Sequence, residues 1–106
     1  MRMQARGEDL LAEYVNRLAR AYPRSTIVLF GSRARGDNLP YSDYDIAIIL
    51  PDEECGDKLE ETIRARRLKP RGISVDVLVL CASELDEDPL VKQMLRDAKT
   101  LYAPRH

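Results

Sequence analysis

Residues 25–50, STIVLFGSRARGDNLPYSDYDIAIIL, contain two apolar runs separated by a stretch rich in glycine and charged residues. The first run, Ser25–Phe30, has the β-branched, apolar composition of a buried strand, and it stops at Gly31, where the chain must turn. The second run, Asp43–Leu50, ends at a proline. Between them, Gly36–Pro40 is dense in turn residues. This stretch therefore predicts two strands joined by a turn.

The flanking sequence predicts three helices and one further strand. Apolar residues recur at three- and four-residue spacing over residues 8–21, which is typical of an amphipathic helix. A weaker helical pattern covers residues 57–68, and an apolar run over residues 73–80 predicts the third strand. Asp88 followed by Pro89 is a typical helix start, and the helical spacing continues to Ala98.

The predicted order of elements is α-β-(turn)-β-α-β-α, which indicates a small α/β (α+β) domain with helices packed on one sheet. With 106 residues the chain is long enough for one domain with a modest core. We therefore expect residues 1–106 to form a single domain.

Composition and charge argue against several classes of protein. The net charge of −1 gives no overall electrostatic case for direct nucleic-acid binding. No segment has the apolar length of a membrane span or of a secretory signal, so we expect a cytoplasmic protein. Cys55 and Cys81 lack zinc-type spacing and are interpreted as a loop thiol and a buried thiol, not as a disulfide framework. The single histidine, His106, is the last residue, which leaves little room for histidine-based catalysis.

Three aspartates are the candidate catalytic and metal-binding residues. Residues two apart in a strand point to the same face, so Asp43 and Asp45 share a face with Ala47. Asp76 interrupts the apolar third strand, and all three carboxylates can converge if the second and third strands are neighbours. Clustered carboxylates repel one another, and a hard divalent cation, Mg²⁺ or Mn²⁺, relieves this repulsion. Sites with two such ions commonly catalyse phosphoryl or nucleotidyl transfer.

The residues after the first strand are suited to binding phosphate. Gly31 lets the backbone approach phosphate oxygens closely, and Ser32 adds a hydroxyl donor. If the following residues begin a helical turn, its free N–H groups point at the same anion. Arg33 or Arg35 can add positive charge.

Each of these features alone has a simpler explanation. A lone Asp-x-Asp is more often part of a surface strand or turn, and Asp76 alone can protect an edge strand from aggregation. Arg33 and Arg35 alone are typical solvated side chains. The combination of strand, Gly-Ser, a ten-residue gap, Asp-x-Asp and a third strand with an internal acid favours the metal-dependent site.

The pattern LFGSRARGD…SDYDIAIIL…VDVLVL resembles the nucleotidyltransferase superfamily related to DNA polymerase β. The Ala34-Arg35-Gly36 segment and Ser42 before the first aspartate resemble its minimal nucleotidyltransferase (MNT) branch, with antitoxins of the MntA type. The closing LVKQMLRDAKTLY is similar to the end of that branch, a helix leading into a short Leu-Tyr segment. The similarity covers nearly the whole chain and implies a small polymerase β-like fold with a mixed sheet.

The resemblance implies a role for each matching residue. Asp43, Asp45 and Asp76 would be the catalytic acids and the ligands of two Mg²⁺ ions (Mn²⁺ being possible), with Asp76 helping to activate the acceptor hydroxyl. The implied nucleotide-binding residues, for ATP as substrate, are Gly31, Ser32, Arg33, Arg35 and Ser42. Tyr44 departs from the aliphatic residue common between the two aspartates, and it is expected to point to the other face.

The resemblance also implies a partner. Small MNT proteins are typically partners of HEPN-domain ribonuclease toxins, in a hetero-oligomer, and transfer AMP from ATP to a tyrosine hydroxyl of the toxin. One alternative is nucleotidyl transfer to a small molecule such as an aminoglycoside. Another is a non-catalytic antitoxin that covers its partner, for which the basic segment 64–71 and the apolar stripe at residues 90–101 are candidate contact surfaces. An unrelated Mg²⁺-dependent nuclease does not explain the Gly-Ser.

Overall fold

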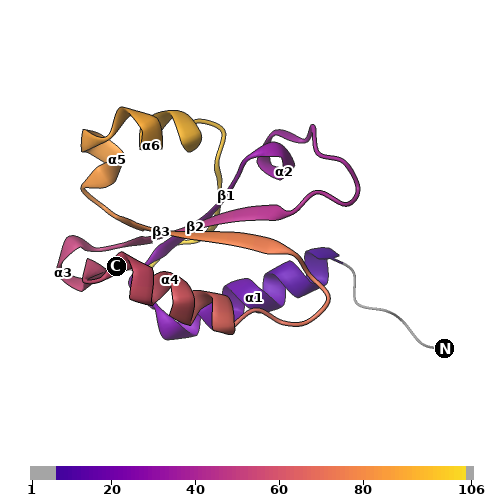
Figure 1. The fold of residues 1–106 in the computed structure, drawn as a ribbon, viewed down its shortest axis with the longest axis horizontal. Helices are drawn as coiled ribbons and strands as arrows, with labels where there is room; N and C mark the ends of the chain where they lie inside the picture. Colours follow the sequence, from indigo (N-terminus) through magenta and orange to yellow (C-terminus); the bar gives the residue numbers. More distant parts are fainter. Residues whose placement is uncertain (1–6, 105–106) are drawn as a thin grey trace.

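The computed structural model describes residues 7–104, which form one four-stranded sheet with helices on both faces (Figure 1). The strand order is β3-β2-β1-β4. The strands are β1 (Thr26–Phe30), β2 (Tyr44–Leu50), β3 (Val75–Cys81) and β4 (Lys99–Tyr102). The helices are α1 (Gly7–Ala21), α2 (Ser32–Arg35), α3 (Asp52–Cys55), α4 (Lys58–Arg67), α5 (Glu84–Glu87) and α6 (Pro89–Met94). His106 lies outside the described residues.

The predicted fold class is confirmed, and the predicted strands and main helices are present with boundaries shifted by one or two residues. The last helix, α6, is shorter than predicted, because the next backbone bonds span three residues, from Arg96 N–H to the Gln93 carbonyl and from Ala98 N–H to that of Leu95, and form turns. β4 was not predicted as a strand, since Lys99–Tyr102 lacks a clear apolar alternation and gains its extended form by pairing with β1. The short helices α3 and α5 were not predicted either.

The sheet is mixed. β1 pairs antiparallel with both β2 and β4, whereas β2 pairs with β3 in parallel. A parallel pair needs a crossover connection, which α3 and α4 provide here. The side chain of Asp57 caps the N-terminus of α4 by accepting from the backbone N–H groups of Leu59 and Glu60. The crossover places Asp76 directly beside Asp45 in the register of β2 and β3.

Apolar side chains cover both faces of the central strand β2, which explains its nearly continuous apolar sequence. On one face Ile46, Ile48 and Leu50 pack with residues of α1 and α4. On the other face Ala47 and Ile49 pack under α5 and α6. Figure 1 shows α1 and α4 below the sheet, and α5, α6 and α2 above it, with α2 at the opposite end from α5.

The interpretation of the two cysteines as separate thiols is wrong, because the structure joins Cys55 and Cys81 in a disulfide. Cys55 ends α3, just after β2, and Cys81 is the last residue of β3, the strand beside β2. Their Cα atoms are 5.4 Å apart, within the range for a disulfide. Their separation of 26 residues gave no indication of this proximity, which arises from the parallel pairing.

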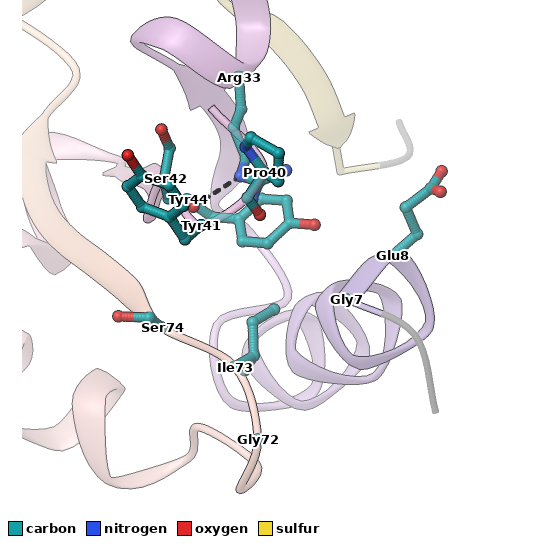
Figure 2. A pocket seen from close by; sticks show the side chains of 10 residues that line it. All are labelled: Gly7, Glu8, Arg33, Pro40, Tyr41, Ser42, Tyr44, Gly72, Ile73 and Ser74. Carbon is teal, nitrogen blue, oxygen red and sulfur yellow. Dashed lines mark hydrogen bonds between the residues drawn. The ribbon is translucent and has the colours of Figure 1, made fainter. Parts of the chain in front are cut away.

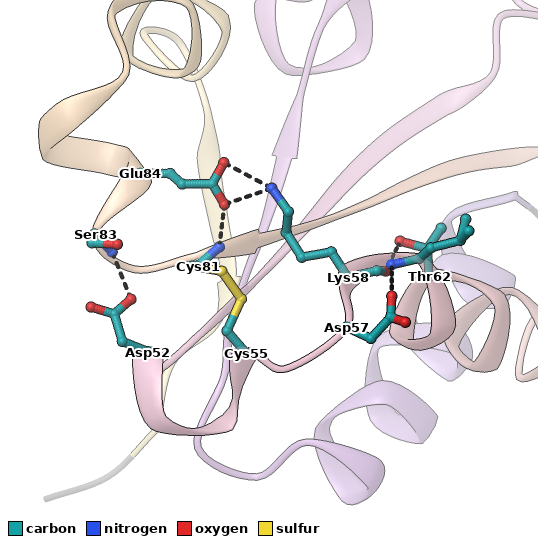
Figure 3. The surroundings of a disulfide bond; sticks show 9 residues. Asp52, Cys55, Asp57, Lys58, Thr62, Cys81, Ser83 and Glu84 are labelled. Carbon is teal, nitrogen blue, oxygen red and sulfur yellow. Dashed lines mark hydrogen bonds and ion pairs between the residues drawn. A yellow bond between two sulfur atoms is a disulfide. The ribbon is translucent and has the colours of Figure 1, made fainter.

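Polar contacts surround the disulfide and fasten the crossover to the end of β3 (Figure 3). Glu84 accepts from the backbone N–H of Cys81 at 2.8 Å and from Lys58 Nζ at 3.0 Å. Asp52 accepts from the backbone N–H of Ser83 at 3.0 Å.

Within residues 7–104, no helix combines the length and the apolar character that crossing a membrane requires.

Candidate active site

Two of the predicted acids, Asp45 and Asp76, lie at one end of the sheet on the face that also carries α2, and the charge of Asp43 acts on Asp45. Asp45 is partly buried on β2, with Phe30 of β1 as its partner on one side and Asp76 of β3 on the other. Asp43 immediately precedes β2, and both Asp43 and Asp76 are exposed. The predicted neighbouring of the second and third strands is confirmed, and the two strand carboxylates occupy directly paired positions.

The electrostatics of the cluster centre on Asp45. Burial raises the pKa of the Asp45 carboxyl above its usual value, and the negative charges of Asp76 and Asp43 raise it further. Arg35 opposes this shift but does not cancel it. The site thus has an excess of negative charge, which makes it suited to a cation.

The donor set is compatible with magnesium. In the part of the chain that the structure describes, no three His, Cys, Asp or Glu side chains form a ready-made metal cage. Mg²⁺ does not require one, because it is usually held by one or two carboxylates together with waters and substrate phosphates. Asp45 and Asp76, with Asp43 adjacent, supply hard oxygen donors of this kind.

Gly31 is required by Asp45. A Cβ at position 31 would lie 3.1 Å from Asp45 Cγ and closer still to its Oδ2, so a side chain there would force the carboxylate to move. The φ angle of Gly31 is also +77°, in the left-handed region that favours glycine. The sequence suggested this glycine for approach to phosphate; the structure adds its close packing against Asp45.

The predicted helical turn after the Gly-Ser is present as α2, which begins at Ser32. The backbone N–H groups of Ala34 and Arg35 donate to the Gly31 carbonyl oxygen, each at 3.1 Å. The first N–H groups of a helix have no acceptor within it and are free to bind an anion. Because Gly31 packs against Asp45, the start of α2 follows directly from the residue beside the carboxylates.

The two arginines of α2 have different environments. The Arg35 side chain is exposed, pairs with Asp37 at 3.1 Å and is close enough to Asp45 to lower its pKa. The Arg33 guanidinium lies over the Tyr44 ring, with Arg33 Cζ 4.1 Å from the ring centroid. This geometry makes Arg35 the better placed of the two for nucleotide contact.

Arg33 instead fastens the loop between α2 and β2. Its Nε donates to the carbonyl oxygen of Ser42 at 2.8 Å, and its Nη2 donates to that of Pro40 at 3.0 Å. The Ser42 hydroxyl in turn accepts from the backbone N–H of Leu39 at 3.0 Å, so Ser42 stabilises a turn within the same loop. These contacts favour positioning roles for Arg33 and Ser42 over direct contact with a nucleotide.

A cavity that sequence reasoning missed lies on the side of Tyr44 (Figure 2). Its volume is about 470 Å³, and its lining includes Arg33, Tyr44 and Ile73 together with the start of α1 at Gly7. Tyr44 points away from the face of Asp45, as predicted, and its hydroxyl approaches Gly7. None of the three acids lines this cavity, so it does not coincide with the carboxylate cluster.

Comparisons with known proteins agree with the fold described above. A family model described as "Nucleotidyltransferase domain" matches residues 11–102. The chain is similar to the crystal structure of a candidate nucleotidyltransferase from Sulfolobus solfataricus, at 28% identity and a TM-score of 0.70, covering 92% of this chain and 80% of that one. It shares its fold with the crystal structure of a toxin–antitoxin with AMP-PNP, at 23% identity and a TM-score of 0.53, covering 89% and 74%. The curated proteins that were compared include no match.

Proposed function

Because the chain belongs to the nucleotidyltransferase domain family, we propose that it transfers AMP from ATP to a protein hydroxyl. The observation that carries this proposal is the pairing of Asp45 with Asp76 across β2 and β3, with Gly31 and the start of α2 beside Asp45. Acids and a phosphate-binding turn are thus brought together from three separate segments of the chain.

Asp43, Asp45 and Asp76 would hold the Mg²⁺ ions, which on binding supply Lewis-acid stabilisation of the charge that develops on the phosphate oxygens. The chain's own residues bind and orient the nucleotide. Ser32 and the first N–H groups of α2 hold the triphosphate, and Arg35 adds positive charge at the same face. Asp76, being exposed, is accessible to an incoming acceptor hydroxyl and accepts its proton.

In the transfer, the acceptor oxygen forms a bond to the α-phosphorus of ATP. The bond between the α-phosphorus and the oxygen bridging to the β-phosphorus breaks, and pyrophosphate leaves. The acceptor gives up its hydroxyl proton in the same step. The products are an adenylylated hydroxyl and pyrophosphate.

The exposure of the site favours a protein as the acceptor. Asp43 and Asp76 are both exposed, so the acceptor side of the site is an open surface. A small molecule is usually bound in a concave pocket that encloses most of its surface, whereas an open surface suits a macromolecular partner. A partner that contacts this surface would supply the rest of the acceptor site.

A HEPN-domain toxin is the partner that we propose, with a tyrosine as the acceptor. This proposal rests on the motif resemblance and is supported by the fold shared with a solved toxin–antitoxin that carries an ATP analogue. A phenol has an ordinary pKa of about 10, so it needs only modest activation to act as a nucleophile. In this role the chain would be the antitoxin.

The test is the intact mass of a HEPN-domain protein encoded beside this chain, after incubation with the chain, ATP and Mg²⁺. We expect a gain of one or more AMP units, which a chelator and the double substitution Asp43→Asn/Asp45→Asn each prevent. Asp97→Asn, an exposed position outside the cluster, is the matched control and should retain transfer. A stable complex with no gain in mass would contradict the transferase proposal and favour an antitoxin that covers its partner.

A further inference from the structure

The five tyrosines of the chain differ sharply in environment. The Tyr14 hydroxyl donates to the carbonyl oxygen of Ala65 at 2.7 Å. The hydroxyls of Tyr22 and Tyr102 donate to Glu61 and to the carbonyl oxygen of Pro23, respectively. Tyr44 is buried, with Arg33 over its ring. Four of the five are therefore occupied by contacts within the fold.

Tyr41 is the exception. Its side chain is 80% exposed, and its hydroxyl makes no hydrogen bond to any of the described residues 7–104. Figure 2 shows Tyr41 among the side chains that line the cavity beside Tyr44. Tyr41 lines an open cavity and does not fill the core, so its side chain stays accessible to solvent.

Tyr41 is held next to the carboxylate cluster. It precedes Asp43 by two residues, which limits the distance between their Cα atoms to about 7 Å. The backbone N–H of Ser42 donates to the carbonyl oxygen of Leu39 at 3.0 Å, which closes a turn around Tyr41. Arg33 binds the carbonyl oxygens on both sides of Tyr41, those of Pro40 and Ser42, and so ties this turn to α2.

We propose that Tyr41 is a modification site, at which the chain adenylylates itself. The inference rests on the proposed nucleotidyltransferase function and assigns it an acceptor within the chain. The Tyr41 phenol oxygen forms a bond to the α-phosphorus of ATP, the bond from that phosphorus to the oxygen leading to the β-phosphorus breaks, and pyrophosphate leaves. The phenol proton passes to a neighbouring carboxylate or to water.

The geometry supports this acceptor over the other four tyrosines. Tyr41 is free of hydrogen bonds within the described residues and solvent-exposed, and it lies in the segment that leads through Asp43 into β2, the strand that carries Asp45. Its product is a phosphodiester, which places one additional negative charge beside Asp43. That charge repels a further triphosphate, so self-modification should reduce the chain's activity toward other acceptors.

The experiment incubates the purified chain with ATP and Mg²⁺ in the absence of any partner, followed by intact mass and peptide mapping. We expect a gain of one AMP unit, either as purified or after incubation, located on Tyr41. Tyr41→Phe should abolish this gain. Tyr102→Phe, which removes a hydroxyl already bonded to Pro23, is the matched control and should leave it unchanged.

Transfer to the HEPN-domain protein, measured in parallel, separates the two proposals. Tyr41→Phe should still modify the partner, because Tyr41 does not belong to the catalytic machinery. If the partner gains AMP while the wild-type chain alone remains unmodified, or is modified at another residue, the inference about Tyr41 is overturned and the proposed function stands. If neither protein gains AMP, both are overturned.

Discussion

The Asp45 carboxylate lies so close to Gly31 that a Cβ at position 31 would be 3.1 Å from Asp45 Cγ. Gly31→Ala should therefore displace the carboxylate, in addition to straining a backbone with φ of +77°. We expect a loss of about 2–4 kcal/mol in the free energy of unfolding, together with loss of nucleotidyl transfer. Chemical denaturation and the AMP-transfer assay measure the two effects.

Gly36 provides a partial control, because its φ of +86° is also positive, its ψ of 8° places it in the less strained left-handed helical region, and nothing lies within 4 Å of the position that a Cβ would take. Gly36→Ala should cost only the backbone strain, about 1 kcal/mol, and should retain transfer. Equal loss of activity in both variants would show that neither the packing against Asp45 nor the backbone conformation of Gly31 is what the site requires.

Asp45→Asn should increase stability while removing activity. The raised pKa means that folding favours the protonated form of Asp45, so its charge lowers the free energy of unfolding at a pH above that pKa. In metal-free buffer at pH 7 we expect a gain of about 0.5–1 kcal/mol, which should vanish as the pH falls below the ordinary value near 4. Transfer should decrease at least about 100-fold. A variant less stable than wild type at pH 7 would contradict this account of the cluster.

Arg33→Ala should destabilise the loop between α2 and β2. The substitution removes a stacking contact with Tyr44 and two hydrogen bonds to backbone carbonyls, together about 1–2 kcal/mol. Arg35→Ala should change stability by less than about 0.5 kcal/mol, since its pair with Asp37 is exposed, but should raise the KM for ATP. Thermal unfolding measures the stability of both variants, and steady-state kinetics measures their KM for ATP. If Arg35→Ala proved destabilising and Arg33→Ala raised only the KM, these assignments would be refuted.

Replacing both cysteines with alanine should lower the free energy of unfolding by about 3 kcal/mol. The disulfide closes a segment of 26 residues, and its loss frees that segment in the unfolded chain. Reduction of the wild-type protein should give the same decrease, whereas a reductant should leave the double variant unaffected. Full alkylation of both thiols in the native, unreduced protein would contradict the disulfide.

Glu84 should contribute stability that depends on pH. Its hydrogen bond from the backbone N–H of Cys81 and its contact with Lys58 lower the pKa of the Glu84 carboxyl. A lowered pKa stabilises the fold at pH values above the ordinary value for glutamate, and this contribution is lost as the pH falls through the lowered value. Glu84→Gln should thus be less stable by about 1 kcal/mol at pH 7 and nearly equal to wild type at strongly acidic pH. A difference independent of pH would attribute the effect to packing instead.

Much of the candidate site could be predicted from sequence because it follows strand periodicity. Residues two apart on a strand share a face, and the structure places Asp45 with Ala47 and Ile49, as expected, whereas Asp43 lies just before the strand. The neighbouring of β2 and β3 was a condition of the prediction, and the crossover through α4 satisfies it. Local pattern and simple topology were sufficient here.

Other features depend on contacts that no local pattern records. The approach of Cys55 to Cys81 depends on which strand lies beside β2, and the extended form of Lys99–Tyr102 depends on its pairing with β1. Arg33 and Arg35 are equally basic in sequence, but residues two apart in a helical turn point to different sides. Only the fold shows that one meets Tyr44 and the other the carboxylates.

The disulfide and the paired acids are connected by the pairing of β2 with β3. Leu50 is opposite Cys81 at one end, and Asp45 is opposite Asp76 five residue pairs away. A slip of one residue between β2 and β3 would turn Asp76 to the opposite face and separate it from Asp45. The covalent link between Cys55 and Cys81 restricts such a slip from the far end of the ladder. A covalent bond at the opposite end of β2 and β3 thus helps to keep the Asp45 and Asp76 carboxylates aligned for the proposed transfer reaction.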